Sequence, residues 1–155
     1  MTGQRFAVTV CVLLRRGDQW LLSVRAPGVA YAPGSIGLIG GHVESPAPEP
    51  GVLESTARRE FAEETGLDLV GVPLRYLESE YFLTEAGEPQ VTVTFTATAP
   101  DGATPHVNAP DELTEVGWWT AAEVAADPRC PPWLSALIRR VGLASGQAPD
   151  RAATK

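Results

Sequence analysis

The stretch from Val52 to Thr65 constrains the fold most, because it combines a helical pattern with acidic residues on the apolar side. Its apolar residues recur at four-residue spacing, as in the buried row of an amphipathic helix: Leu53, Ala57 and Phe61. At about 100° per residue, Glu60 and Glu64 fall within the same stripe. Acid runs usually form a solvated face, but carboxylates beside a buried row are costly unless they are paired or bind a metal ion. The stretch therefore predicts a helix whose acidic residues have a function.

Three carboxylates lie within about one and a quarter turns of this helix: Glu60, Glu63 and Glu64. Like charges four residues apart repel one another on a bare helix, so this arrangement has a cost that something must offset. Mg²⁺ prefers oxygen ligands, and proteins usually share it between carboxylates and the phosphates of a substrate. The spacing therefore indicates a site for a hard divalent cation.

Two segments carry a resemblance to a known family. Positions 59 to 67 read Arg-Glu-Phe-Ala-Glu-Glu-Thr-Gly-Leu, and positions 40 to 44 read Gly-Gly-His-Val-Glu. They resemble the signature of the Nudix hydrolases, in which a glycine segment precedes Arg-Glu-apolar-x-Glu-Glu-x-Gly-apolar. The resemblance implies an α/β fold, a Nudix-type α/β/α sandwich with a mixed sheet. It also implies Mg²⁺-dependent (or Mn²⁺-dependent) hydrolysis of a pyrophosphate bond.

The chain departs from this signature between its two halves. Gly41 lies eighteen residues before Arg59, whereas the family spacing is fourteen. About four extra residues therefore lengthen the loop within positions 45–50, and Gly51 stands where the family has its middle glutamate. Either Glu49 or Glu44 replaces that glutamate, or the contact is missing. Because three prolines restrict this segment, we expect a surface excursion that leaves Gly41 and the helix in register.

The resemblance also implies roles for individual residues. The metal ligands are expected to be Glu60, Glu63 and Glu64 together with the backbone carbonyl of Gly41, and Arg59 is expected to hold one of the carboxylates in place. The expected catalytic set is Glu63, Glu60, Arg59 and a general base.

Later acidic residues precede the Trp118-Trp119 pair, and one of them is expected to be that base. Glu112 is the first choice and Glu115 the second, while a solvated loop carboxylate remains the alternative for both. Arg25 and Tyr31 are candidates for contacting a substrate phosphate or base, and His42 is expected to be a filler residue of the motif loop.

The remaining pattern predicts an alternation of strands and helices around the motif helix. Strands are expected at 5–14, 19–24, 36–43, within 67–83, at 90–99 and at 115–119, and further helices at 121–126 and 131–141. We expect a single Nudix hydrolase domain over residues 1–143. Residues 144–155 are expected to form a disordered tail.

The composition limits the kinds of partner that this chain is expected to bind. With a formal net charge of −7, the chain is not expected to bind a nucleic acid polymer, which is itself negatively charged. No segment has the ~20 apolar residues of a membrane helix, so no membrane partner is expected. Cys11 and Cys130 form neither a disulfide framework nor a metal-ligand spacing, so a reducing, cytoplasmic setting is expected. The sequence leaves open whether the chain forms a homodimer.

The expected substrate is a small nucleotide: a nucleoside di- or triphosphate, or a nucleoside diphosphate linked to another moiety. Two other classes of function also stay open. One is a catalytically silent Nudix domain that binds a nucleotide as a sensor, and the other is a structural or partner-binding domain without metal affinity.

Overall fold

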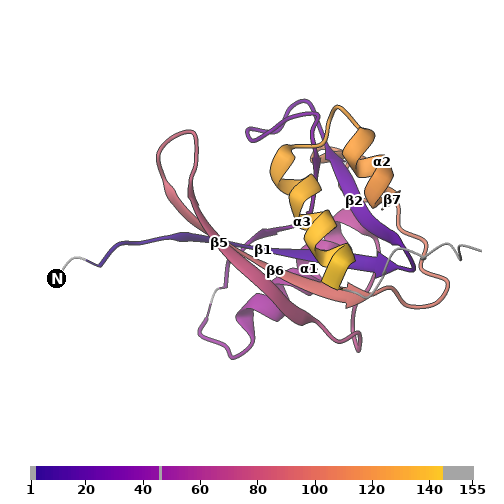
Figure 1. Ribbon diagram of the computed structural model, residues 1–155. Helices are drawn as coiled ribbons and strands as arrows, with labels where there is room; N and C mark the ends of the chain where they lie inside the picture. Colours follow the sequence, from indigo (N-terminus) through magenta and orange to yellow (C-terminus); the bar gives the residue numbers. More distant parts are fainter. Residues whose placement is uncertain (1–2, 46, 145–155) are drawn as a thin grey trace, which may run out of the picture.

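A central mixed sheet with helices on both faces forms the fold, as Figure 1 shows for the computed structural model, which describes residues 3–45 and 47–144. The elements are β1 (Ala7–Arg16), β2 (Gln19–Arg25), β3 (Ile36–Gly37), β4 (Ile39–His42), α1 (Val52–Thr65), β5 (Arg75–Leu83), β6 (Pro89–Thr98), β7 (Leu113–Thr120), α2 (Ala121–Ala126) and α3 (Pro132–Ala144). The predicted α/β/α sandwich with a mixed sheet is confirmed.

Strand β1 organises the sheet. It runs parallel to β6 over nine residue pairs, from Ala7 opposite Gln90 to Arg15 opposite Thr98, and antiparallel to its other neighbours. β1 and β2 pair only beside their hairpin and then separate. The glycine-rich segment fills the resulting wedge, because β3 enters it alongside β2 and β4 leaves it alongside β1. The segment expected as one strand over 36–43 is therefore two strands that meet at Leu38.

The two faces of the sheet bury separate cores, as period-two alternation along a strand requires. On one face Val12 and Leu14 of β1 pack with Ala57 and Phe61 of α1. On the other face, Leu13 joins a cluster that includes residues of α2 and α3. The helix carrying the motif is thus fixed against the same strands that flank the glycine segment.

Helix α1 has the predicted bounds, and Gly66 ends it in a left-handed conformation with φ 70°. The loop between β6 and β7 then fastens its C-terminal end. Asn108 donates from its side chain to the carbonyl of Glu63 (2.9 Å) and from its backbone to the carbonyl of Glu64 (3.0 Å). These bonds satisfy carbonyl groups that have no partner within the helix, so the loop holds the carboxylate-bearing turn in place.

Other boundaries differ from expectation for local reasons. Between residues 67 and 83 the described chain has one strand, β5, because residues 67–74 form turns and irregular structure instead. Arg58 holds this segment by donating to the carbonyls of Leu69 and Val72. Arg58 therefore joins helix α1 to the segment that follows it. Helix α3 continues to Ala144 because Gly142 stays helical instead of capping. Of the expected tail, residues 145–155 lie outside the described residues.

Within the described residues, no helix is both long enough and apolar enough to cross a membrane.

Candidate active site between the glycine strand and helix α1

Two glycines let β4 approach both β1 and α1. A Cβ atom on Gly40 would overlap the backbone carbonyl of Val10, and one on Gly41 would overlap the carboxylate of Glu60. The bare backbone of Gly40 donates its N–H to Oε2 of Glu64 at 3.2 Å. The glycine pair of the sequence signature is thus in direct contact with the acidic helix.

Glu64 is a buried carboxylate with only 6% of its surface exposed. Burial raises its pKa to about 8, and the negative charges of Glu112 and Glu60 add to the rise, while the Gly40 hydrogen bond and the charge of Arg25 oppose it. Low polarity and nearby negative charge both favour the protonated form of this carboxyl. A cation at this point would relieve both.

Glu60 lies on the same helix edge and is partly buried. Its pKa is raised, chiefly by burial, with smaller contributions from Glu63 and Glu112, and the neighbouring Arg59 opposes the rise. Nη1 of Arg59 lies 2.8 Å from Oε1 of Glu60 and 3.4 Å from Oε1 of Glu63. Arg59 therefore contacts two of the three motif carboxylates.

Among the later acidic residues, the structure separates the two candidates for general base. Glu112 precedes β7, and its charge raises the pKa of both Glu60 and Glu64, so it acts electrostatically on the cluster. Glu115 instead pairs with Arg129, its Oε2 lying 3.0 Å from Nη1. The charge of Glu112 thus acts on the motif carboxylates, whereas Glu115 has another partner.

Arg25 and Tyr31, the residues expected to contact substrate, lie together. Nε of Arg25 donates to the carbonyl oxygen of Tyr31 at 2.6 Å, and its guanidinium lies 5.7 Å from the centre of the Tyr31 ring. The charge of Arg25 lowers the pKa of Glu64, so it acts on the acidic cluster. Tyr31 is exposed and available to a ligand.

Two residues near this site carried no signal in the sequence. Cys11 pairs with Gly40 across β1 and β4, and burial raises the pKa of its thiol to about 12, with Glu64 adding to the rise. Asn108 reaches the site from a loop that is distant in sequence. Neither residue belongs to a recognisable spacing, because both come into place through sheet register and loop packing.

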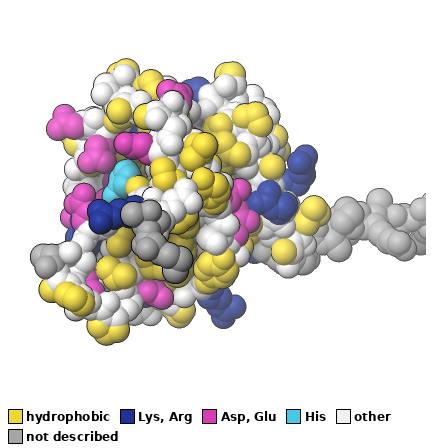
Figure 2. Space-filling model, turned by 90° about the vertical axis from the view of Figure 1, so that its left-hand side faces the viewer, with side chains coloured by type: hydrophobic (Ala, Val, Ile, Leu, Met, Phe, Trp, Pro, Cys, Tyr) yellow, Lys and Arg dark blue, Asp and Glu magenta, His cyan; other side chains and the backbone are white. Residues whose placement is uncertain are grey.

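The remaining motif residues lie at the surface. His42 is exposed on β4, in keeping with a filler role, and the space-filling view shows acidic side chains gathered beside a histidine (Figure 2). In the lengthened loop, Ser45 donates to Glu49 at 3.0 Å, so Glu49 braces the loop itself. Gly51 has φ 69°, a left-handed conformation that disfavours glutamate at this position. Pro46 lies outside the described residues.

The donor set suits a hard cation but is not assembled in advance. Across residues 3–45 and 47–144, no three acidic, histidine or cysteine side chains are arranged to hold a metal ion. Glu64 is turned to Gly40, while Glu60 and Glu63 are turned to Arg59. The ligand atoms offered by Glu60, Glu63 and Glu64 are all oxygen, as Mg²⁺ and Mn²⁺ prefer. Burial and neighbouring carboxylates disfavour the ionised form of Glu64, and a bound cation would stabilise that form.

Comparisons with known proteins agree with the fold. The family model described as "NUDIX domain" matches residues 4–141. A MutT Nudix hydrolase from Burkholderia pseudomallei is 24% identical over 89% of this chain and 99% of its own, with a TM-score of 0.72. The MutT protein from Methanosarcina mazei Go1 is 17% identical over 95% and 100% of the two chains, with a TM-score of 0.73.

A third solved structure, the dihydroneopterin triphosphate pyrophosphohydrolase of E. coli, is 16% identical over 88% of this chain and 95% of its own, with a TM-score of 0.66. No curated protein sequence matches this chain. The family model covers most of the sequence, including both halves of the signature. The chain therefore belongs to the NUDIX domain family, the family of Nudix pyrophosphohydrolases.

Proposed function

We propose that this protein hydrolyses a pyrophosphate bond in a nucleoside di- or triphosphate, or in a nucleoside diphosphate linked to another moiety, with the help of Mg²⁺ or Mn²⁺. The observation that carries the proposal is Glu64. It is a buried carboxylate on the motif helix, with Glu60 and Glu112 adding negative charge around it. Burying a carboxylate in this way lowers the stability of the fold, but it gives the domain a site for cations and phosphates.

Glu60, Glu63 and Glu64, with the backbone carbonyl of Gly41, are the residues that would hold the metal. When bound, divalent cations neutralise phosphate charge and make the phosphorus easier to attack. The fit rests on the oxygen donor set and on the close contact between Gly41 and Glu60. Arg59 supports this role, because it orients Glu60 and Glu63 before any ligand arrives.

The remaining residues have roles in orientation and proton transfer. Glu112 is the proposed general base, which accepts a proton from the attacking water. The effect of its charge on Glu60 and Glu64 supports this choice over Glu115, whose ion pair with Arg129 would have to break first. A general base must lie within reach of the proton it removes, so geometry decides before pKa does.

Arg25 and Tyr31 are the proposed contacts to substrate. The Arg25 guanidinium already lies against the Tyr31 backbone and ring, so little side-chain freedom is lost when it meets a phosphate. An aromatic ring beside a guanidinium also suits a nucleobase attached to phosphates. The E. coli neighbour acts on a pterin triphosphate, which has the same combination of a flat ring and a phosphate chain.

A screen of nucleotides tests the proposal. The purified chain is incubated with nucleoside di- and triphosphates, dinucleoside polyphosphates and sugar nucleotides, and released phosphate or pyrophosphate is measured with and without Mg²⁺. We expect Mg²⁺-dependent turnover of at least one substrate in this panel. Absence of turnover across the panel by a folded protein would remove the proposal.

The second candidate is a silent domain that binds nucleotide as a sensor. The lengthened loop and Gly51, which stands where the family has its middle glutamate, favour it. It predicts nucleotide binding by calorimetry without turnover in the same panel. The intact set of Glu60, Glu63 and Glu64 weighs against it.

A further inference from the structure

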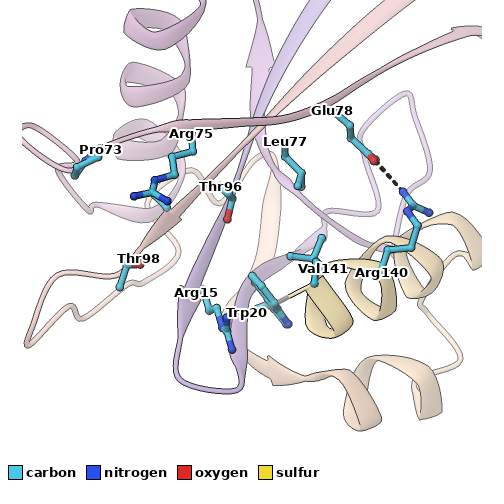
Figure 3. A pocket seen from close by; sticks show the side chains of 12 residues that line it. Arg15, Trp20, Pro73, Arg75, Leu77, Glu78, Thr96, Thr98, Arg140 and Val141 are labelled. Carbon is cyan, nitrogen blue, oxygen red and sulfur yellow. Dashed lines mark hydrogen bonds and ion pairs between the residues drawn. The ribbon is translucent and has the colours of Figure 1, made fainter. Parts of the chain in front are cut away.

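A pocket lies apart from the carboxylate cluster, where the ends of β1, β5, β6 and α3 meet (Figure 3). Its volume is about 670 Å³, within the range of small-molecule sites. Its lining includes Arg15, which lies four residues beyond Cys11 on β1, roughly 13 Å at the usual rise per residue. The proposed function uses none of the residues that line it.

The pocket is cationic in a chain whose net charge is −7. Three arginines line it from three separate elements: Arg15 of β1, Arg75 of β5 and Arg140 of α3. Figure 3 shows them on different sides of the cavity. Glu78 is the single acidic residue among the lining residues that the structure describes. Two positive charges therefore remain in excess within the pocket.

The pairing of these groups leaves donors for a ligand. Both carboxylate oxygens of Glu78 accept from Nη2 of Arg140 at 3.0 Å, so these two side chains neutralise one another. No carboxylate in the described part of the chain pairs with Arg15 or Arg75. Thr96 of β6 also lines the pocket, but its hydroxyl donates to the carbonyl of Leu13 at 3.2 Å, so the two arginines are the donors that remain.

Arg15 is held in position for binding. Its Nε donates to the carbonyl of Gly17 at 2.6 Å, and its guanidinium lies 5.3 Å from the centre of the Trp20 ring. These contacts use one donor and one face of the guanidinium, and they restrict its rotamers. A fixed guanidinium loses less freedom when it binds an oxyanion than a freely rotating one does.

We propose that this pocket is a second, non-catalytic site for a small phosphate-bearing anion. Planar guanidinium groups match phosphate geometry with paired hydrogen bonds. Two arginines without a carboxylate partner offer more donors and more positive charge than a ligand with a single carboxylate would need. The ligand bridges Arg15 of β1 and Arg75 of β5, beside the ion pair of Arg140 with Glu78 that joins α3 to β5.

Calorimetry on the full chain tests the proposal, with inorganic pyrophosphate as the probe and excess chelator to suppress metal-dependent binding. We expect saturable binding that Arg75→Gln weakens by about tenfold or more, because the exposed Arg75 has no carboxylate partner to disturb. Arg139→Gln, on α3 but outside the pocket lining, is the matched control and is expected to keep the wild-type affinity. Equal losses in the two variants, or no saturable binding, would overturn the proposal.

A variant that is expected to bind pyrophosphate more tightly tests the proposal independently. Glu78→Gln frees Arg140 and is expected to tighten pyrophosphate binding about threefold or more, whereas Glu80→Gln on the same strand leaves it unchanged. If Glu78→Gln weakens binding, the arginines do not form the site. Adenosine monophosphate in place of pyrophosphate distinguishes the sources: tighter binding indicates a nucleotide ligand, and weaker binding an inorganic one. If neither binds, the site is not a phosphate site.

Discussion

Glu64→Gln is expected to stabilise the metal-free protein while removing its activity. The substitution keeps the size of the side chain and leaves an amide oxygen to accept from the Gly40 N–H. It removes a carboxylate whose pKa is raised from 4.5 to about 8. That rise corresponds to about 5 kcal/mol once the group is fully ionised. Local relaxation and water entry reduce it, so we expect a gain of about 2–4 kcal/mol at pH 8.

The stability gained by Glu64→Gln is expected to increase as the pH rises. Between pH 4.5 and about 8 the folded protein holds the proton of Glu64 while the unfolded chain has released it. Folding stability of the wild type therefore falls as pH rises through this window, and the cost is constant above it. Well below pH 4.5 both states are protonated, and at about pH 4.5 and below the two proteins are expected to differ by less than about 1 kcal/mol.

Urea unfolding in excess chelator at about pH 5, 6.5 and 8 measures this difference. Glu63→Gln, which removes an exposed carboxylate of the same helix, is the control and should show no comparable gain. Added Mg²⁺ is expected to stabilise the wild type more than Glu64→Gln, since ligands stabilise the state that binds them. A variant that is no more stable than wild type at pH 8 would refute the argument that Glu64 carries an uncompensated charge.

Three further predictions concern the metal, the glycine pair and the later acidic residues. Turnover should stop in excess chelator and return with Mg²⁺ or Mn²⁺; turnover that persists without metal contradicts the mechanism. Gly40→Ala should cost about 2 kcal/mol or more in chemical denaturation, because its Cβ would overlap backbone, whereas Gly41→Ala should mainly displace a glutamate side chain and lower kcat. Glu112→Gln should lower kcat by about 10²-fold or more and Glu115→Gln by much less; the reverse order would place the general base elsewhere.

The lengthened loop supports one last prediction. Deleting four residues within 45–50 restores the family spacing, and turnover should stay within about tenfold, or ~1.4 kcal/mol of barrier, if the loop is only an excursion. Gly51 should be retained in this variant, because its φ of 69° disfavours a glutamate. Complete loss of turnover by a folded deletion variant would show that the loop itself helps to build the site.

The motif helix was predictable because several local signals agree. The apolar row, the Gly66 cap and the acidic signature all belong to one short segment, and the helix spans the predicted residues. The sandwich and mixed sheet followed from the resemblance. The break between β3 and β4 at Leu38 did not, because it depends on the separation of β1 from β2, and no local pattern encodes that separation.

The arrangement of the site was only partly predictable. Sequence reasoning ranked Glu112 above Glu115, and the ion pair of Glu115 with Arg129 supplies a reason that needs long-range contacts. It missed Asn108 and Cys11, since their places depend on loop packing and strand register. Contacts within one helix can be inferred from spacing, whereas contacts between elements require the fold.

The central claim is that the carboxylates around Glu64 support metal-dependent hydrolysis of a pyrophosphate bond. Phosphorus NMR of a nucleoside triphosphate mixed with the purified chain tests it most directly, because substrate and products are seen together. With Mg²⁺ we predict that pyrophosphate-bond signals decline and monophosphate signals appear, and that Glu64→Gln and excess chelator each abolish the change. Spectra that stay unchanged over a panel of nucleotides, or that change equally with Glu64→Gln, would contradict the account.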